Sequence, residues 1–343
     1  MRREGSYPDS PMKLNLVPVF LALLFNCDST LAIDVDRPVV QDFIDGMVST
    51  HDYDRETLVA MLEDAKSRES IIEAISRPAE KTLEWHEYRA IFLTEKRIDA
   101  GVAFWDEHQG ELERISRGTG VPCEMLVSII GVETFFGRIT GGYRVIDALT
   151  TLAFDYPPRS KFFRRELEQF FLLVREEGMD ARDATGSYAG AMGAPQFMPS
   201  SYRAYAVDSS DDGRRDIWSN WSDVIGSVAN YFVEHDWQPG DPVVARATLP
   251  AEWKHAPPTN ILRPADSVMS LSRKGVMFST SLPADHPTQL LTLNGDNGTE
   301  HWVGFHNFFV ITRYNRSVMY ALAVHQLGQE IALARTMAAA DKR

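Results

Sequence analysis

The chain has 343 residues, of which 44% are hydrophobic and 10% aromatic, and this globular composition excludes wholesale disorder. It carries 35 Lys and Arg against 48 Asp and Glu, so the net charge of -13 argues against non-specific binding to nucleic acid or to an anionic membrane surface. An anionic substrate would therefore have to be held by local donors.

The N-terminal 32 residues have the pattern of a signal peptide. Leu14–Phe25 is an apolar run of 12 residues behind Lys13, which is short for a membrane span and typical of a signal-peptide core. Thr30-Leu31-Ala32 predicts cleavage after Ala32, with translation starting at Met1 or Met12. A signal peptide is favoured over the alternative, a buried N-terminal helix. Lipid anchoring at Cys27 is disfavoured, because no small residue directly precedes it.

Export leaves the charge unchanged and removes one cysteine. Residues 1–32 hold three basic and three acidic residues, so the mature chain keeps the net charge of -13. Cys123 would be its single cysteine, which predicts a domain without an internal disulfide, held together by its hydrophobic core.

The first half of the chain reads as helical and a later stretch as β-rich. Apolar periodicity predicts helices over Arg55–Arg68, Ile98–Arg117, Cys123–Glu133 and Arg159–Glu177. Near Trp237 the composition shifts to short apolar runs between turn residues, which predict strands at Val243–Leu249, Val268–Leu271, Gln289–Leu293 and Phe308–Ile311, with a turn at Asn294-Gly295. Ser317–Ala338 returns to a helical pattern. The chain is therefore mainly α, with a small β-rich insertion.

Glu133 is the first candidate for chemistry. It is the only charged residue in Leu126–Phe136, the most apolar stretch of the mature chain. Burial disfavours the charged form of a carboxyl group, so the pattern predicts a raised pKa and a general acid. The structural alternative is a helix-end glutamate that points to water.

A glycine-rich segment, Gly186–Tyr202, is the second candidate. Gly186, Gly190 and Gly193 predict a tight loop that presents the polar side chains of Ser187 and Gln196. The segment lacks the lysine of a phosphate-binding loop, so nucleotide binding is disfavoured. A purely structural turn is the alternative.

Asp208–Gly213 follows the first half of an EF-hand loop. Asp208, Ser210 and Asp212 occupy positions 1, 3 and 5, Gly213 occupies position 6, and the carbonyl of Arg214 would be the next ligand. Position 12 is Ser219 instead of glutamate, so Asp216 or Asp223 would have to complete the site. A solvated acidic turn is the alternative.

Other reactive residue types carry weaker patterns. His301 and His306 lie on a predicted strand without a partner at zinc spacing and read as structural, and Cys123 in an apolar helix is a poor nucleophile candidate. The glycosylation-like triplets at Asn220, Asn297 and Asn315 are interpreted as chance matches.

Taken together, these segments resemble the membrane-bound lytic murein transglycosylase B family of the lysozyme-like superfamily. The resemblance rests on six sequence motifs that occur between Trp85 and Gln329 in the same order as in the family. They are Gly131–Gly137, Arg144–Leu152, Phe154–Pro157, Gly186–Tyr202, Ile225–Phe232 and Val310–Ser317. It implies a mainly α (α+β) fold with a lysozyme-like core at 101–236 that includes the EF-hand-like loop 208–223. Around it lie an N-terminal helical region at 33–100, the β-rich insertion at 237–312 and a C-terminal segment at 313–343.

The resemblance also implies roles for individual residues. The family's single catalytic glutamate falls on Glu133, and its groove residues fall on Tyr88, Ser187, Gln196, Tyr231, Asn315 and Tyr320. Its calcium loop falls on Asp208, Ser210, Asp212, Arg214 and Asp223, although this chain is one residue longer before Asp223. The chemistry needs no cofactor, and Ca²⁺ would be structural.

The implied activity is cleavage of peptidoglycan between N-acetylmuramic acid and N-acetylglucosamine, without water, to leave a 1,6-anhydro sugar. The binding partner is then the glycan strand, with proteins of cell-wall synthesis or turnover as a further class, and the location is the periplasm. Glycosidases usually need two carboxylates, and Asp147 and Asp155, the nearest second candidates, read as structural. A hydrolytic muramidase and a non-catalytic peptidoglycan-binding or scaffolding protein are the alternatives.

Overall fold

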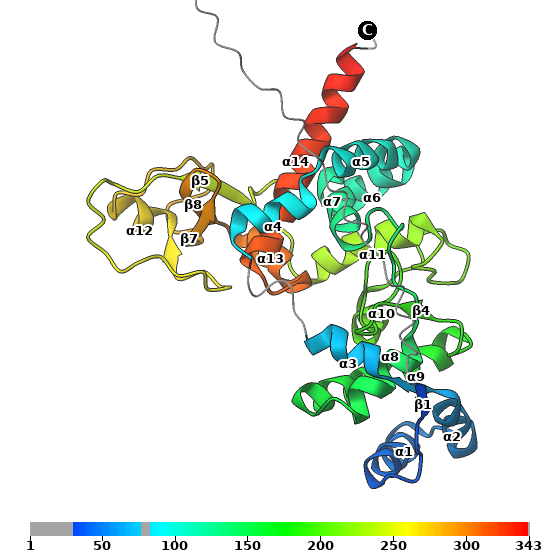
Figure 1. Cartoon of the computed structure of the whole chain (residues 1–343). Coiled ribbons are helices and arrows are strands. Elements are labelled where there is room, and N and C mark those ends of the chain that lie inside the picture. Colours follow the sequence, from blue (N-terminus) through cyan, green and yellow to red (C-terminus); the bar gives the residue numbers. More distant parts are fainter. Residues whose placement is uncertain (1–29, 77–82, 342–343) are drawn as a thin grey trace, which may run out of the picture.

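A computed structural model describes residues 30–76 and 83–341. The predicted signal-peptide core, both candidate start residues and Cys27 lie outside these residues. The fold is mainly α with small antiparallel sheets, as the sequence predicts, and it is built from three parts that each have a hydrophobic core (Figure 1). No helix within the described residues is long and apolar enough to cross a membrane.

The first part, which we call the side lobe, packs the N-terminal helices onto two long central helices. Its elements are β1 (Thr30–Ala32), α1 (Pro38–His51), α2 (Arg55–Asp64), β2 (Lys66–Arg68), α3 (Glu69–Ser76), β3 (Tyr143–Arg144), α8 (Val145–Phe154), η2 (Pro157–Arg159), α9 (Ser160–Glu177), β4 (Thr185–Gly186) and α10 (Pro199–Tyr205). Strand β1 pairs with β2 and ends at the predicted cleavage point, so cleavage after Ala32 would remove it.

The second part, which we call the helical body, surrounds α7. Its elements are α4 (Trp85–Phe92), α5 (Glu95–Glu107), α6 (Gln109–Thr119), α7 (Cys123–Thr134), α11 (Trp221–Glu234), α13 (His306–Tyr314) and α14 (Val318–Asp341). Helix α7 is apolar on all sides because α5, α6, α11 and α14 pack around it, and Met125 to Val132 are all buried. This packing fixes the end of α7, where Glu133 lies.

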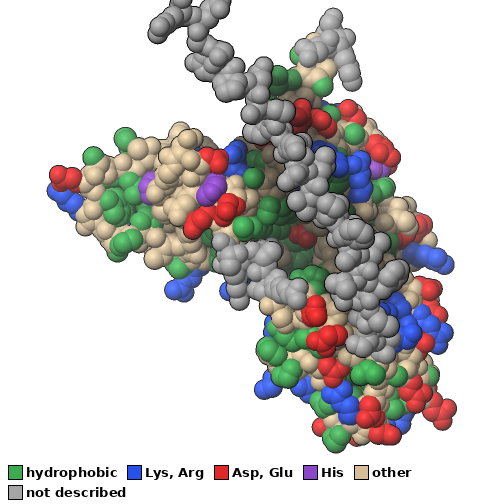
Figure 2. All heavy atoms as spheres, in the orientation of Figure 1, with side chains coloured by type: hydrophobic (Ala, Val, Ile, Leu, Met, Phe, Trp, Pro, Cys, Tyr) green, Lys and Arg blue, Asp and Glu red, His purple; other side chains and the backbone are tan. Residues whose placement is uncertain are grey.

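The third part, which we call the β-lobe, is a four-stranded antiparallel sheet in the order β5-β8-β7-β6. Its elements are β5 (Val244–Ala247), β6 (Asp266–Ser267), α12 (Val268–Arg273), β7 (Pro287–Gly295) and β8 (Gly298–Gly304). The hairpin of β7 and β8 contacts α4, where Asn294 Nδ2 donates to Glu84 Oε2 over 2.9 Å. The surface is hollowed where the β-lobe, the side lobe and the helical body meet (Figure 2).

Two predicted strands are wrong. Val268–Leu271 begins helix α12, because the Ser267 side chain accepts a hydrogen bond from Ser270 N and caps the first turn. Phe308–Ile311 lies in α13 and is buried against the helical body. Val268–Leu271 contains the polar Ser270 and Phe308–Ile311 is wholly apolar, but at four residues periodicity cannot assign either segment to strand or helix.

Other boundaries shift by a few residues. The predicted helix Ile98–Arg117 is two helices that meet at His108, and Lys66–Arg68 leaves the predicted helix Arg55–Arg68 to form β2. His306 begins α13, so only His301 lies on a strand. The β-hairpin turn is at residues 296–297 instead of Asn294-Gly295, since Gly295 pairs with Gly298. The boundaries of the four regions stay a prediction.

Candidate functional site

Glu133 lies in the last turn of α7 and is partly exposed, while its neighbours Val132 and Thr134 are buried. Tyr320, in the first turn of α14, donates a hydrogen bond from its hydroxyl to Glu133 Oε1 over 2.5 Å. Such a bond to a carboxyl oxygen is charge-assisted when the group is ionised, and it fixes the orientation of the carboxyl group. This hydrogen bond places Tyr320, one of the groove residues that the resemblance implies, directly beside Glu133.

The backbone after Glu133 turns away sharply. Phe135, Phe136 and Gly137 have φ angles of 51°, 59° and 76°, three left-handed residues in succession. This conformation costs on the order of 1–3 kcal/mol for a residue with a side chain, so the surroundings must enforce it. A Cβ on Gly137 would lie 2.7 Å from the Trp221 ring, which leaves room only for glycine.

Thr134 fastens this turn to the glycine-rich loop. Its hydroxyl donates to the Ala194 carbonyl over 3.0 Å and accepts from Gly137 N over 3.0 Å. The end of α7 and the loop around Gly193 therefore form one rigid unit. The left-handed turn and the Thr134 contact were not predicted from the sequence.

The glycine-rich loop holds its two predicted groove residues differently. Ser187 Oγ accepts hydrogen bonds from Ala189 N and Ala191 N, so this hydroxyl shapes the loop itself. Gln196 has a φ angle of 52°, and its Nε2 donates to the carbonyls of Thr140 and Gly193. Gln196 therefore bridges the loop to the segment that follows Glu133.

Aromatic rings form the wall between α11 and α13. Tyr231 donates to the Arg313 carbonyl over 2.7 Å and stacks on His235 with ring centroids 4.1 Å apart. Tyr314 lies 4.6 Å from the Tyr231 ring and donates to the Pro195 carbonyl over 2.7 Å. Tyr314 was not identified from the sequence as a site residue, although it directly precedes Asn315 in the motif Val310–Ser317.

Burial keeps these hydroxyl groups protonated. It raises the pKa of Tyr314 and Tyr320 well above the ordinary tyrosine value, and the charge of Glu133 raises the pKa of both further. Tyr88, the upstream groove residue, is 1% exposed and contributes to the same effect on the pKa of Tyr320. Tyr314 and Tyr320 are therefore hydrogen-bond donors over the whole physiological pH range.

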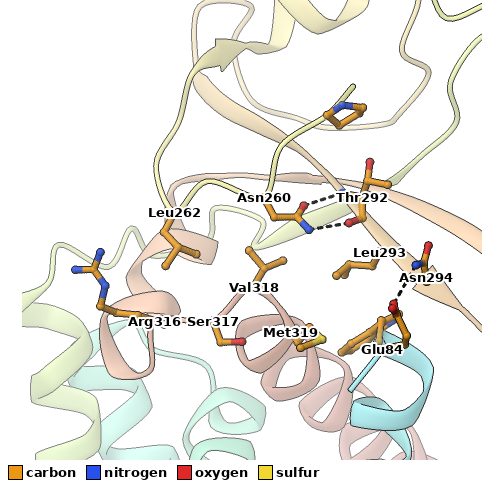
Figure 3. A pocket seen from close by; sticks show the side chains of 12 residues that line it. Glu84, Asn260, Leu262, Thr292, Leu293, Asn294, Arg316, Ser317, Val318 and Met319 are labelled. Carbon is orange, nitrogen blue, oxygen red and sulfur yellow. Dashed lines mark hydrogen bonds between the residues drawn. The ribbon is translucent and has the colours of Figure 1, made fainter. Parts of the chain in front are cut away.

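A cavity of about 520 Å³ adjoins the first turn of α14 (Figure 3). Ser317, Val318 and Met319 line one side, directly before Tyr320 in the chain, and the β-lobe supplies the opposite wall. Glu133 itself is not among the lining residues. Asn315, between α13 and α14, is half-buried, and its side-chain amide makes no hydrogen bond within residues 30–76 and 83–341. The cavity therefore lies between the start of α14 and the β-lobe, next in the chain to the tyrosine that contacts Glu133.

The EF-hand-like loop assembles three carboxylates. Asp208, Asp212 and Asp223 each place an oxygen within 4.8 Å of the others, and Asp223 is fully buried. Desolvation raises the pKa of Asp208, but hydrogen bonds from Gly213, Asp212 and Asp211 outweigh it and leave the pKa below the ordinary value. Negative charges on carboxylates this close would repel one another, and a cation between them would remove that repulsion. The oxygen-only donor set suits a hard cation such as Ca²⁺.

The other predicted metal ligands lie around the same loop. The Ser210 hydroxyl donates to Asp208 Oδ1 over 3.2 Å, and Arg214 N donates to Asp212 Oδ1 over 2.9 Å. Asp223, rather than Asp216, completes the cluster, and it also accepts hydrogen bonds from Ser209 N, Ser210 N and Asp216 N. The carboxylate of Asp216 caps its own turn at Trp218 N and Ser219 N.

Asp147 and Asp155, the candidates for a second catalytic carboxylate, form hydrogen bonds and ion pairs within the side lobe. Asp147 is fully buried and accepts hydrogen bonds from Lys66 N and from the Arg68 guanidinium at 3.0 to 3.1 Å. Asp155 pairs with Arg37 over 2.7 Å and accepts from the Ser67 hydroxyl. Both carboxylates therefore hold β2 and α1 onto α8, which is the structural role expected of them.

The remaining sequence candidates have structural partners. His301 Nδ1 lies 2.9 Å from Thr292 Oγ1, and His306 Nε2 lies 2.7 Å from the Asp236 carbonyl. Desolvation raises the pKa of the Cys123 thiol, which makes it a weaker nucleophile.

Known proteins resemble this chain over nearly its whole length. The model of the transglycosylase SLT domain family matches residues 36–329. Membrane-bound lytic murein transglycosylase B of Escherichia coli K12 is 42% identical over 309 residues, which are 88% of this chain and 84% of the relative. A soluble lytic transglycosylase from Pseudomonas aeruginosa is 51% identical, with a TM-score of 0.83 over 87% of this chain and all of that structure. An Escherichia coli lytic transglycosylase solved in complex with calcium is 41% identical, with a TM-score of 0.80 over 90% and 97% of the two chains.

Proposed function

The chain belongs to the transglycosylase SLT domain family, and from this membership and the geometry around Glu133 we propose that it is a lytic transglycosylase that cleaves the glycan strands of peptidoglycan. The observation that supports this best is the partly exposed carboxyl group of Glu133, which the hydroxyl of Tyr320 holds in a fixed orientation. The alternative carboxylates, Asp147 and Asp155, are held in the side lobe.

The reaction needs one group that acts first as an acid and then as a base. Glu133 in its protonated form donates a proton to the oxygen of the bond between N-acetylmuramic acid and N-acetylglucosamine, and that bond breaks. The acetamido oxygen of the muramic residue bonds to C1 and stabilises the positive charge there. Ionised Glu133 then takes the proton of the C6 hydroxyl, whose oxygen displaces the acetamido oxygen at C1. The product is a 1,6-anhydro sugar, and no water is consumed.

The surrounding residues suit the binding of sugars. The side-chain amide of Asn315 and the side-chain carbonyl of Gln196 offer polar atoms for hydroxyl and acetamido substituents. Tyr88 and Tyr231 are buried and support the wall of the groove from behind. Ser187 contributes by holding the shape of the loop. The cavity beside Ser317 gives room for further sugars of the strand.

The proposal is tested by mass spectrometry of the fragments that the protein, without residues 1–32, releases from purified peptidoglycan. Fragments lighter by one water than their reducing-end equivalents are expected. Fragments with ordinary reducing ends would instead identify a hydrolytic muramidase. Binding without release would identify a non-catalytic peptidoglycan-binding protein.

We further propose that Asp208, Ser210, Asp212, Asp223 and the carbonyl of Arg214 bind a structural Ca²⁺. At a calcium concentration ten times Kd, the ion should stabilise the fold by about 1.4 kcal/mol, which raises Tm by roughly 2 °C in a chain of this length. The variant Asp212→Asn keeps the turn but removes one charge, so it should lose most of this shift. The matched control, Asp211→Asn, changes a neighbouring exposed aspartate outside the cluster and should keep it. Equal shifts in both variants would contradict the assignment.

We also propose that residues 1–32 direct export and are cleaved, and that the protein acts in the periplasm, where peptidoglycan lies. The apolar run at Leu14–Phe25 and the small residues at Thr30 and Ala32 support this. N-terminal sequencing of the protein purified from the cell envelope should begin at Ile33.

A further inference from the structure

Three cationic side chains surround one aromatic ring next to the candidate site. Lys96 Nζ, Arg97 Cζ and Arg138 Cζ lie 5.8, 5.1 and 5.2 Å from the centroid of the Phe135 ring. Lys96 and Arg97 come from the first turns of α5, and Arg138 follows the left-handed turn after α7. We call these four residues the cation cluster.

The cation cluster is not neutralised by the protein. Within residues 30–76 and 83–341, none of the three cations has a carboxylate oxygen within 4.0 Å, although Glu95 and Asp99 lie on the same helix. Lys96 and Arg138 are exposed, and Arg97 donates to the Ile91 carbonyl while its buried Nε has no partner. Elsewhere, arginines such as Arg203 and Arg335 form ion pairs. Three unpaired cations this close repel one another, and an anion between them would remove that repulsion.

The cluster also lies on the rim of the candidate site. Phe135 is two residues after Glu133, and Thr140, at the end of the same segment, accepts a hydrogen bond from Gln196. On the other side, Arg97 lies 5.1 Å from the Phe92 ring, which packs 5.1 Å from Tyr88. The cation cluster therefore lies between two predicted groove residues, Gln196 and Tyr88.

We propose that the cation cluster binds the carboxylates of the peptide stem that peptidoglycan carries on its muramic residues, an inference that rests on the proposed function. The sugar rings and acetamido groups of a glycan strand are neutral, whereas the stem carries free carboxylates close to the bond that is cut. Guanidinium groups bind carboxylates through two parallel hydrogen bonds. Cation–π contact with Phe135 keeps both guanidinium groups beside the ring before the substrate arrives. Because the protein as a whole is strongly acidic, this local cluster is what allows an anionic stem to approach.

Binding of two defined tetrasaccharides tests the proposal. One carries peptide stems with free carboxylates, and the other carries the same stems as carboxamides, so the two differ only in charge. Binding is measured in a Glu133→Gln background, so that neither ligand is cut. The protein should bind the carboxylate ligand more tightly than the carboxamide ligand. The double variant Lys96→Gln, Arg138→Gln should weaken binding of the carboxylate ligand about fivefold, and should change binding of the carboxamide ligand less than twofold. The preference should fade as salt concentration rises.

A charge-matched control separates the local effect from the change in net charge. The double variant Arg263→Gln, Arg273→Gln removes two exposed cations from the part of the chain around α12 and should keep the preference. Equal weakening for both ligands, or none for either, would overturn the proposal. If the unmodified protein cuts no glycan but still prefers the carboxylate ligand, the proposed reaction fails and the carboxylate site stands.

Discussion

Replacement of Glu133 by glutamine is expected to reduce kcat for glycan cleavage by about 10²- to 10⁴-fold, which is the usual contribution of general acid and base catalysis. Glutamine has the shape of glutamate, and its carbonyl oxygen can still accept the hydrogen bond from Tyr320. It can neither donate a proton to the glycosidic oxygen nor accept one from the C6 hydroxyl. Folding and glycan binding should therefore persist while cleavage is lost, as measured by turnover of soluble glycan strands and by Tm.

Glu124 provides the matched control, because it lies at the other end of the same helix. Glu124→Gln should keep kcat within about twofold, since a single surface charge in the first turn of a helix contributes only a few tenths of a kcal/mol. Full activity of Glu133→Gln would mean that another group acts as the acid. Unfolding of that variant would mean that Glu133 is chiefly structural.

Replacement of Tyr320 by phenylalanine is expected to lower kcat roughly 10- to 100-fold, because it removes a charge-assisted hydrogen bond worth about 1.5–3 kcal/mol. Burial, followed by the charge of Glu133, raises the pKa of Tyr320, so its hydroxyl stays a donor throughout the working pH range. A donor at this oxygen favours the ionised form of the carboxyl group. Without it, the protonated form should persist to higher pH. The alkaline limb of the kcat profile should therefore move upward in pH.

The pH profile distinguishes this role from a packing defect. Tyr53→Phe is the matched control, since Tyr53 is a buried tyrosine whose hydroxyl donates to the Phe171 carbonyl in the side lobe. It should lower Tm and leave the kcat profile in place. A Tyr320→Phe profile that falls in height but does not move along the pH axis would show that Tyr320 supports the fold and does not act on Glu133.

The sequence predicts those parts of the fold in which the local pattern agrees with tertiary packing. Helix α7 was predicted to within one residue, because Pro122 starts it and because its uniformly apolar surface is buried on all sides. The errors at Val268–Leu271 and Phe308–Ile311 have one cause. Four residues are too few for the apolar pattern to separate a strand from a helix. A side-chain cap makes Val268–Leu271 helical in α12, and burial against the helical body stabilises Phe308–Ile311 in α13.

The site was predictable only in part for a similar reason. Glu133 stands out in sequence as a lone charge in an apolar stretch, but its hydrogen bond to Tyr320 joins residues 187 positions apart. The left-handed turn at Phe135 and Phe136 could not be predicted either, since phenylalanine disfavours it and Thr134 and Trp221 enforce it from outside. The same holds for the cation cluster, because Lys96 and Arg138 meet only when α5 packs beside α7.

The central claim is that a single carboxyl group, that of Glu133, catalyses attack on C1 of the muramic residue by the C6 hydroxyl of the same sugar. Water does not attack C1. Digestion of purified glycan strands in water enriched in ¹⁸O, followed by mass spectrometry of the new chain ends, tests this most directly. We expect anhydro ends without the label, because no solvent oxygen enters the product. Label at C1 of the released muramic residues would contradict the claim and would require a water molecule and a second base beside Glu133.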